Sequence, residues 1–437
     1  MKEYFGLGYM QSPNTIYNDI FQVNPGELIS VSQDGSIHKK VLLSFAKKLN
    51  SNSNFKDVYT TKKYDSLLHG VIKKQLVSDV SIASFLSGGI DSPLIAAIAK
   101  SQKNDIEAFT LGVEDKKFDE SEKAIAYADY VGLKHHIEYI DESSLIKHID
   151  RHFQFFSEPF GDYSSIPTYA ITKKAKSRHT VMLSGDGGDE LFFGYPRMLD
   201  VYKYRFWFKI PHAIRKPLIR VAIKLKLAKT WGPFFYDKID QWVLAKQLHI
   251  SKRNLNTIIT DTNFSKELKA LYTIPKRKQT KENLLHWLRY NEFYAHMQRV
   301  LVKVDRMSMA NSLEVRVPLL DKASINFAWN YMPKFKNNRF KLKDILKKMM
   351  TLYYPSKVIE EEKKGFSVPI EIWLKTHLKS DVENVIFEKP FYGEKHINKE
   401  VLLEYVTRFF NGEHNEAWGV WHIYAWQKWA LAQKLIK

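Results

Sequence analysis

Short apolar runs and longer stretches with helical spacing alternate along the first half of the chain. The short runs predict buried strands at four places, Val80 to Leu86, Ala108–Val113, His135–Ile140 and Thr180–Leu183. Helical patterns predict helices at about Thr61 to Leu76, after Pro93, and at Ser121–Val131, where Gly132 provides the stop. Strands that alternate with helices form a parallel sheet whose loops gather at its carboxyl edge. We therefore predict an α/β fold built on a doubly wound parallel sheet.

The two ends of the chain show other patterns. Residues 1–55 contain short strand candidates, and Asp34-Gly35 predicts a hairpin turn between Leu28–Val31 and Ile37–Val41. The polar stretch Leu49 to Phe55 predicts a linker, so we divide the chain into residues 1–55 and 56–437. Beyond residue 200 the pattern is mostly helical. Four closely spaced tryptophans near the C-terminus predict a packed helix face: Trp418, Trp421, Trp426 and Trp429.

Composition narrows the class of protein. The 437 residues are 44% hydrophobic and include no cysteine, which excludes disulfides and thiolate metal sites. No apolar run reaches the ~18 residues of a membrane span, and the first thirty residues lack the charged start and apolar core of a secretory signal. We expect a soluble, cytoplasmic protein without a transmembrane segment.

The formal net charge of +19 raises the question of an anionic partner. Residues 201–236 contain nine Lys or Arg and no Asp or Glu, with apolar residues between the charges. This stretch is either a helical insertion that buries its aromatic residues, which we favour, or a basic amphipathic segment that contacts a membrane surface or an anionic acceptor through residues 201–229. Pro211 and Pro217 should interrupt any long helix there. No RNA-binding motif is visible, so we expect no nucleic-acid partner.

The most informative segment follows the first core strand and reads Ser87-Gly88-Gly89-Ile90-Asp91-Ser92. Glycines permit a tight turn and close approach to a ligand, and the N–H groups of the turn and helix start favour an anion. An aspartate beside phosphates is consistent with Mg²⁺, which takes carboxylate and phosphate oxygens together. The segment is not the common phosphate loop, because no Gly-Lys-Ser/Thr follows.

A second glycine cluster follows the strand predicted at Thr180–Leu183 and reads Ser184-Gly185-Asp186-Gly187-Gly188-Asp189-Glu190. Its three carboxylates repel one another unless a cation or a proton lies among them. It does not match the dinucleotide-binding fingerprint, because Glu190 stands where the last glycine would be. Both clusters follow strands, so we expect them to meet at one edge of the sheet.

Together the two clusters resemble a known family. The segment Ser87 to Ser92 resembles the SGGxDS pyrophosphate loop of the ATP pyrophosphatase superfamily, and residues 184–195 are similar to the SGDGGDELFGGY segment of asparagine synthetase-like enzymes. Residues 158–165, 304–321 and 363–369 resemble further blocks of that family in the same order. The resemblance covers nearly the whole chain and implies the fold of that superfamily, with ATP and Mg²⁺ as cofactors.

The front of the chain departs from the family. Full-length relatives carry an N-terminal glutaminase domain with a cysteine nucleophile, and Tyr4 to Val31 resembles only the last stretch of that domain. Without cysteine, thiolate attack on a glutamine amide cannot occur in this polypeptide. We therefore expect no glutaminase activity here. Nitrogen would come from free ammonia or from a separate glutaminase subunit, unless the chain is a truncated copy.

The resemblance also implies roles for individual residues. Asp91 and Asp189 match Mg²⁺-binding carboxylates, and Asp186 stands at the position assigned to proton transfer. Lys363 matches a lysine that contacts the leaving group, and Lys343 matches a further basic position. The implied contacts with ATP and pyrophosphate are Phe85, Ser87, Gly88, Gly89, Asp91, Ser92, Leu111, Ser184 and Gly185.

The acceptor carboxylate is expected on a different segment. Asp162, Ser164 and Ser165 are candidate acceptor contacts, and Arg316 either joins them or holds a carboxylate such as Glu314 or Asp321. The pair His135-His136 opens a predicted strand, and we interpret it as structural rather than metal-binding.

The family reading implies an amide-forming ligase of the asparagine synthase type. It would convert aspartate, ATP and ammonia to asparagine, AMP and pyrophosphate through a β-aspartyl-AMP intermediate. One alternative keeps this chemistry but uses a sugar uronate or a peptide carboxylate as acceptor. Two further alternatives are a tRNA-modifying ATP pyrophosphatase and a non-catalytic subunit. The presence of Asp91, Asp189 and Lys363 argues against the last of these.

Overall fold

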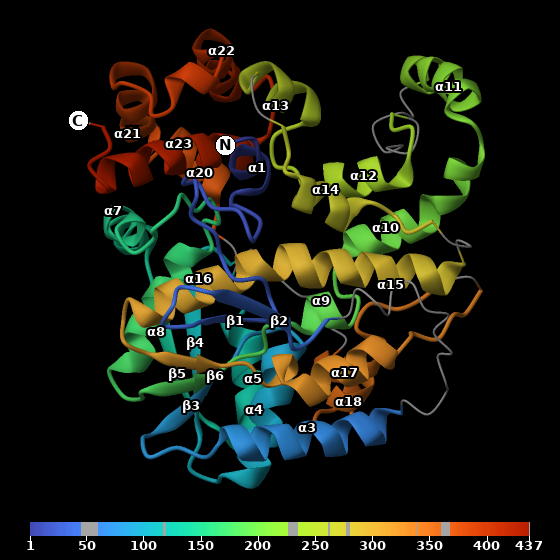
Figure 1. The fold of residues 1–437 in the computed structure, drawn as a ribbon. Coiled ribbons are helices and arrows are strands. Elements are labelled where there is room, and N and C mark those ends of the chain that lie inside the picture. The colour runs from blue at the N-terminus through green and yellow to red at the C-terminus, as the bar shows by residue number, and fades with distance from the viewer. Residues whose placement is uncertain are drawn as a thin grey trace.

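A five-stranded parallel sheet forms the centre of the computed structural model (Figure 1), which describes residues 1–44, 60–116, 119–225, 235–260, 263–276, 280–337, 339–359 and 368–436. Its strand order is β5-β4-β3-β6-β7. The strands are β3 (Ile82–Phe85), β4 (Glu107–Val113), β5 (Lys134–Ile140), β6 (Val181–Leu183) and β7 (Glu314–Arg316). The first four confirm the predicted strands. The fifth was not predicted, because three residues are too few to show a period.

Helices cover both faces of this sheet. Side chains alternate across a strand, so Ile82 packs in one core with α3 (Thr61–Gln75), α4 (Asp91–Gln102) and α5 (Ser121–Val131), whereas Ala83 belongs to the other core. The second face is covered by α8 (Ser165–Lys176) and α16 (Met297–Met309). This arrangement confirms the doubly wound α/β fold and the three helices predicted in this half. As expected, α5 ends at Gly132, whose φ of 67° is left-handed.

The rest of the described chain is mostly helical, as predicted. Its α-helices are α1 (Lys2–Leu7), α6 (Glu142–Ile146), α7 (Ile149–Phe153), α9 (Gly188–Leu191), α10 (Pro196–Tyr204), α11 (His212–Lys224), α12 (Ile239–Ala245), α13 (Lys252–Ile258), α14 (Lys266–Tyr272), α15 (Lys281–Asn291), α17 (Lys322–Asn330), α18 (Asp344–Met350), α19 (Ser356–Ile359), α20 (Ile370–Lys375), α21 (Lys379–Glu383), α22 (Lys399–Phe410) and α23 (Ala417–Ala432). Short 3₁₀ and π turns accompany them at η1 (Arg205–Lys209), η4 (Glu292–His296), η5 (Pro318–Leu320), η6 (Asn384–Glu388) and η7 (Glu394–His396).

One of the two prolines expected to break a helix does not do so. Pro211 lies between η1 and α11, but Pro217 lies inside α11. Pro217 is the sixth residue of that helix and has no N–H to donate to the carbonyl oxygen four residues earlier, yet the helix continues through it to Lys224. The prediction that Pro217 interrupts the helix is therefore wrong.

The first and last segments of the chain pack together. In α1, Tyr4 and Phe5 are fully buried, and the Tyr4 hydroxyl donates a hydrogen bond to the carbonyl oxygen of His422 in α23 at 3.1 Å. Trp421, Trp426 and Trp429 of α23 are buried in the same core, as the tryptophan spacing predicted, whereas Trp418, the fourth, is half-buried and lines the cavity described below. The predicted linker at 49–55 lies outside the described residues, and the division at residue 55 stays a prediction.

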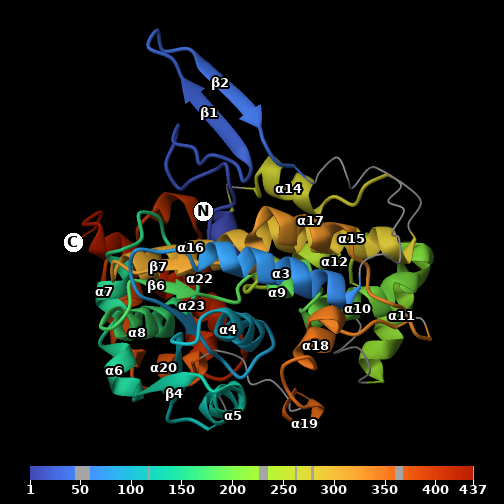
Figure 2. The same cartoon turned by 90° about the horizontal axis from the view of Figure 1, so that it is seen from below.

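The predicted hairpin projects from the body of the protein (Figure 2). It pairs β1 (Glu27–Val31) with β2 (Ile37–Val41) in antiparallel register, and Gly35 in the turn has a φ of 82°. The cross-strand pair Val31 and Ile37 is exposed, as is Val41. The hairpin therefore leaves an apolar face uncovered by the described part of the chain.

Candidate active site

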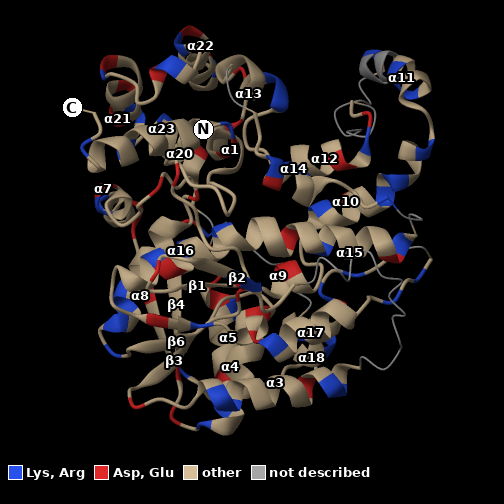
Figure 3. Cartoon of the chain, in the orientation of Figure 1, with Lys and Arg blue, Asp and Glu red and all other residues tan. Residues whose placement is uncertain are grey.

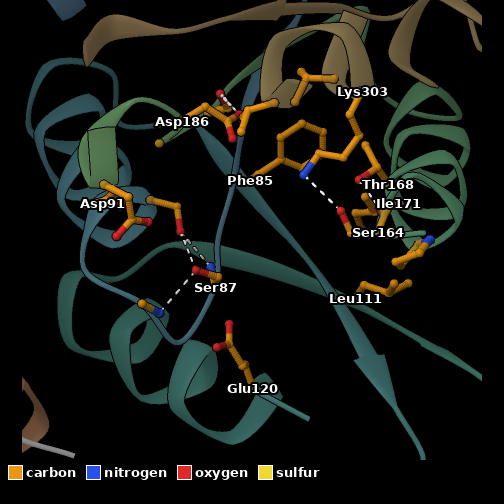
Figure 4. A pocket seen from close by; sticks show the side chains of 18 of the residues that line it. Phe85, Ser87, Asp91, Leu111, Glu120, Ser164, Thr168, Ile171, Asp186 and Lys303 are labelled. Carbon is orange, nitrogen blue, oxygen red and sulfur yellow. Dashed lines mark hydrogen bonds between the residues drawn. The ribbon is translucent and has the colours of Figure 1, made fainter. Parts of the chain in front are cut away.

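A cavity of about 440 Å³ opens at the carboxyl edge of the sheet, where the sequence predicted that the two glycine clusters would meet (Figure 4). Its walls come from the loop after β3, the loop after β6, and helices α8 and α16. The predicted site residues that line it are Phe85, Ser87, Gly89, Asp91, Ser92, Leu111, Asp162, Ser164, Ser184, Gly185, Asp186 and Asp189. Tertiary structure thus gathers three segments, around residues 90, 165 and 185, into one space.

The loop from Ser87 to Ser92 is organised by its own hydroxyl groups. The backbone N–H of Ser87 donates to the Ser92 hydroxyl at 2.9 Å, and the two hydroxyl oxygens are also 2.9 Å apart. The N–H of Gly89 donates to the Ser87 hydroxyl at 3.2 Å. The loop leads directly into α4, whose N-terminal end favours an anion. This geometry suits a phosphate-bearing ligand.

Gly88 belongs to this loop but does not line the cavity. Its N–H donates to the Glu120 carboxylate at 3.3 Å, and a Cβ at this position would lie 3.2 Å from the Cβ of Glu120. Glu120 itself lines the cavity below Ser87 (Figure 4). Gly88 therefore permits the loop to pack closely against the start of α5.

A buried lysine joins the two carboxylates expected to hold a metal. The Lys343 ammonium lies 2.5 Å from Asp91 Oδ2 and 2.7 Å from Asp189 Oδ1. Burial favours the neutral amine, but the two carboxylates outweigh this effect and hold the pKa of Lys343 above its ordinary value. Lys343 therefore carries a positive charge here, and it does so just outside the cavity wall.

Gly188 of the second cluster and Gly194, which follows the cluster, make room for these carboxylates. A Cβ at Gly188 would lie 2.4 Å from Asp91 Cγ, and a Cβ at Gly194 would overlap the carboxylate of Asp189. Neither glycine has a positive φ among the described backbone angles, so close approach rather than backbone conformation requires glycine here. Both glycines allow Asp91 and Asp189 to converge on one cation.

The convergence of Asp91 and Asp189 fits a divalent cation bound with phosphate. The described residues contain no group of three or more His, Asp or Glu arranged as a metal site. A Mg²⁺ ion would therefore take two carboxylates from the protein and its other oxygens from phosphates and water, which is its usual coordination beside nucleotides.

Asp186 lies across the cavity from the wall formed by α8 and α16 (Figure 4). One of its carboxylate oxygens accepts a hydrogen bond from the Ser184 hydroxyl at 2.8 Å. The neighbouring Gly185 packs so closely on the first loop that a Cβ there would lie 2.5 Å from the Ser92 nitrogen. The tight contact at Gly185 fixes Asp186 relative to the loop from Ser87 to Ser92.

The opposite wall carries two cations that the sequence reading missed. Lys303 donates to the Ser164 hydroxyl at 3.2 Å, and Arg299 Nε lies 3.4 Å from Asp162 Oδ2. Burial opposes ionisation of Asp162, but Arg299 and Lys303 outweigh it and lower its pKa. The sequence did contain a signal for this pair: Arg299 and Lys303 are four positions apart, a spacing that places two basic side chains on one face of a helix, here α16.

A protonated carboxyl also borders the cavity. Glu190 is buried, and the Tyr195 hydroxyl donates to it at 2.6 Å. Burial, and then the nearby charge of Asp189, raise the pKa of Glu190 to about 8. Near neutral pH this side chain is therefore mostly neutral. The sequence reading gave it no role.

Five of the predicted site residues lie elsewhere than the cavity wall or cannot be placed, and one of them is Lys343, which lies just outside the wall. Ser165 is buried, and its hydroxyl contacts His152 Nε2 and donates to the carbonyl of Asp162. Arg316 bonds Glu314 at 2.6 Å and donates to the carbonyl oxygens of Gln75 and Val77, so its position favours the structural alternative over acceptor binding. Gly88 belongs to the first loop but does not line the cavity, and Lys363 falls outside the described residues.

The histidine pair on β5 makes contacts within the sheet. His135 Nε2 lies 2.7 Å from the Thr110 hydroxyl, and His136 Nε2 lies 2.8 Å from Glu107. Neither histidine lines the cavity. These contacts support the structural interpretation of the pair.

Comparisons with known proteins find similarity over most of the chain. A model of the asparagine synthase family matches residues 63–431. The chain is 27% identical to glutamine-hydrolyzing asparagine synthetase 1 of Bacillus subtilis (strain 168), over 98% of this chain and 68% of the relative. It is 26% identical to a putative glutamine-hydrolyzing asparagine synthetase of Mycobacterium tuberculosis (strain ATCC 25618 / H37Rv), over 86% of this chain and 58% of the relative.

A third relative matches a shorter part of the chain more closely. The putative glutamine-hydrolyzing asparagine synthetase 2 of Methanocaldococcus jannaschii is 32% identical over 51% of this chain and 43% of its own length. The chain therefore spans between 43% and 68% of the length of these three relatives.

Proposed function

Because this chain belongs to the asparagine synthase family, whose members carry out ATP-dependent amidation, we propose that it joins ammonia to the side-chain carboxylate of aspartate. The products would be asparagine, AMP and pyrophosphate. One observation carries the proposal: a single cavity contains the anion-binding loop from Ser87 to Ser92, the carboxylate of Asp186, and the cations Arg299 and Lys303.

The first step activates the acceptor. One oxygen of the aspartate side chain attacks the α-phosphorus of ATP, so that an O–P bond forms and the bond between the α and β phosphates breaks. The loop at Ser87 to Ser92 would hold the departing pyrophosphate, and Phe85 and Leu111 would lie against the adenosine. The enzyme contributes by aligning the two reactants and by neutralising the charge that builds on the leaving group.

The second step forms the amide. Ammonia attacks the acyl carbon of the adenylate, a C–N bond forms, and AMP leaves with its oxygen. The attacking nitrogen must lose a proton, and Asp186 is the carboxylate that we assign to accept it. The hydrogen bond from the Ser184 hydroxyl at 2.8 Å leaves the other oxygen of Asp186 for this role.

Asp91 and Asp189 are the carboxylates that would hold Mg²⁺, because they lie close together, on either side of the Lys343 ammonium. When bound, the ion would offset negative charge on the phosphates. Lys343 adds positive charge beside the loop. Lys363, at the position of a lysine that contacts the leaving group in relatives, would supply a further charge.

The acceptor would lie against the wall formed by α8 and α16. Arg299 and Lys303 offer positive charge to an acceptor carboxylate, and the hydroxyl of Ser164 offers a hydrogen bond. The same charges would suit a sugar uronate or a peptide carboxylate, which are the alternative acceptors. Nitrogen would come from ammonia or from a separate glutaminase subunit, because this chain has no cysteine.

The test is pyrophosphate release from the purified chain with ATP and Mg²⁺. Its arms are aspartate with ammonium, aspartate with glutamine, and no acceptor. We expect release that depends on aspartate, and asparagine only with ammonium. Asp91→Asn should abolish release, whereas Asp129→Asn, an exposed aspartate on α5, should not. A folded wild-type protein that shows no aspartate-dependent release would contradict aspartate as the acceptor.

A further inference from the structure

Helix α11 (His212–Lys224) stands at the edge of the molecule, apart from the central sheet in both views (Figures 1 and 2). Four apolar side chains on this helix and the residue after it are solvent-exposed: Ile214 at 58%, Leu218 at 45%, Val221 at 55% and Leu225 at 63%. Their spacing of four, three and four residues places them on one helical face. The described part of the chain thus leaves an apolar stripe, Ile214–Leu218–Val221–Leu225, open to solvent.

The interpretation that we favoured from sequence, a helical insertion that buries its aromatic residues, did not foresee this exposed aliphatic stripe. Of the aromatic residues, Trp207 and Phe208 are half-buried, and Phe208 stacks on Trp242 with ring centroids 5.7 Å apart, whereas Phe206 is exposed. The sequence could not decide the point, because a stripe with helical spacing looks the same whether it faces a core or solvent.

The base of α11 is fixed to the rest of the protein. The Arg215 side chain is buried and donates hydrogen bonds to three backbone carbonyl oxygens, those of Ile210 at 2.8 Å, Tyr236 at 3.0 Å and Asp237 at 2.8 Å. These bonds tie the first turns of the helix to the two segments that flank it in space. The helix is therefore held at its base with the stripe presented outward.

The charge around the stripe has one sign. Residues 201–236 include no Asp or Glu, and the described part of α11 shows the colour of Lys and Arg but not that of Asp and Glu (Figure 3). Lys209, Lys216 and Lys224 are exposed. Lys216 and Lys224 lie on other sides of α11 than the stripe, as their offsets of two and ten residues from Ile214 require. The helix thus combines an exposed apolar face with exposed cations and no anion.

We propose that α11 binds an anionic membrane surface, with the stripe inserted at the level of the lipid headgroups and the lysines on the other sides of the helix attracted by the charge of the lipid phosphates. Basic amphipathic helices bind in this way, and each Lys near an anionic bilayer strengthens binding several-fold. The contact is peripheral, since every helix in the described ranges is too short or too polar to cross a bilayer.

Two other occupants fit less well. A second copy of this chain would bring like charges together across the contact, because residues 201–236 are uniformly basic. A nucleic acid would pair with the lysines, but its phosphates would make no favourable contact with the four aliphatic side chains. Lipid acyl chains would make such a contact. Charge and stripe together therefore favour an anionic lipid surface.

Vesicle flotation with the full-length protein tests the proposal. The probes are vesicles of phosphatidylcholine alone and of phosphatidylcholine with about 30% phosphatidylglycerol. We expect binding to the anionic vesicles only. The double variant Leu218→Ser, Val221→Ser should bind about ten-fold more weakly, or weaker still. The double variant Lys216→Gln, Lys224→Gln should lose binding by a similar factor, and added salt should weaken binding of the wild type in the same way.

The matched control is Lys73→Gln with Lys74→Gln on α3. It makes the same change in net charge on exposed lysines of a helix whose apolar face is buried, and it should leave flotation unchanged. Circular dichroism checks that each variant is folded. If the serine variant does not fold, the two lysine variants, which change only surface residues, still test the proposal.

Three results would overturn the proposal. The first is no binding to anionic vesicles, and the second is equal loss in the α11 and α3 lysine variants, which would indicate net charge alone. The third is a wild-type oligomer that Leu218→Ser converts to monomer in sedimentation, which would make α11 a contact between copies. If the wild type binds RNA but not vesicles in the same buffer, a nucleic acid would be the occupant.

Discussion

The ammonium of Lys343 lies 2.5 Å from the carboxylate of Asp91, although the two residues are 252 positions apart in the chain. Lys343 is the residue that precedes α18, and its φ of 52° is left-handed. Its backbone N–H donates to the carbonyl oxygen of Phe192 at 3.2 Å. The second cluster and the Lys343 segment are therefore bound to each other at the site.

Replacing Lys343 with Met should destabilise the protein and abolish activity. It would leave Asp91 and Asp189 close together without their cation, and breaking a buried ion pair from one side costs about 3 kcal/mol. Urea unfolding and pyrophosphate release measure the two effects. Lys347→Met, an exposed lysine on α18, is the control and should change neither. An active, fully stable Lys343→Met protein would contradict the role assigned to the ammonium.

Replacing Gly188 with Ala should cost activity because the new methyl group would overlap the Asp91 carboxylate, whose Cγ is 2.4 Å away. Displacing a catalytic group by about 1 Å reduces the rate roughly 100-fold. Gly70→Ala is the matched change, since a Cβ there meets nothing within 4 Å, and it should stabilise α3 by about 0.5 kcal/mol. Normal kcat in the Gly188→Ala protein would show that Asp91 can move without penalty.

Replacing Asp186 with Asn should separate the two proposed steps. Adenylation does not need the proton acceptor, so pyrophosphate should still be released, whereas amide formation should fall by about 10² to 10⁴. Rapid-quench measurement of pyrophosphate and asparagine in one reaction gives both rates. If adenylation is lost as well in a folded protein, the role assigned to Asp186 is wrong. Asp186→Glu tests whether a longer carboxylate restores amide formation.

Replacing Lys303 with Met should raise the KM for the acceptor and leave the KM for ATP near its wild-type value. The reason is that Lys303 lies on the wall with Ser164, across the cavity from Asp186. Loss of one charged contact is expected to cost about 2 kcal/mol, or roughly 30-fold in KM. Lys173→Met, an exposed lysine on α8, is the control. A change confined to the KM for ATP would place the acceptor elsewhere.

Glu107 should stabilise the sheet in a pH-dependent way. Burial opposes its ionisation, but hydrogen bonds from Lys134, His179 and His136 outweigh burial and lower the pKa of Glu107 from 4.5 to about 2. A lowered pKa gives stability that is complete above pH 4.5 and is lost as the pH falls toward 2. Glu107→Gln should therefore cost about 2 kcal/mol at neutral pH.

The measurement is urea unfolding of wild type and Glu107→Gln between pH 7 and pH 3. The difference in the free energy of unfolding between the two proteins should shrink below pH 4.5, where the ionised carboxylate of the wild type begins to lose its stabilising effect. Glu122→Gln on the exposed side of α5 is the control. A difference that stays constant over the whole range would mean that packing, rather than charge, accounts for the contribution of Glu107.

The sequence alone determined four of the five strands of the sheet and the two glycine-rich loops of the site. Strands and helices of the α/β half follow from local periodicity, since a buried strand and an amphipathic helix each leave a pattern of their own. Ser87 to Ser92 and Ser184 to Glu190 could be singled out because glycines, hydroxyls and carboxylates in such short segments have few uses other than binding phosphates and cations.

Only the tertiary structure decided which distant residues meet and which apolar faces stay open. The bridge from Lys343 to Asp91 and Asp189, and the place of Arg299 and Lys303 opposite Asp186, depend on how helices pack across the sheet. The stripe of α11 had the same pattern as a buried face, and only the absence of a covering element among the described residues showed it to be exposed. Local sequence determines periodicity and the chemistry of the side chains, but it does not determine which element of the fold, or solvent, each side chain contacts.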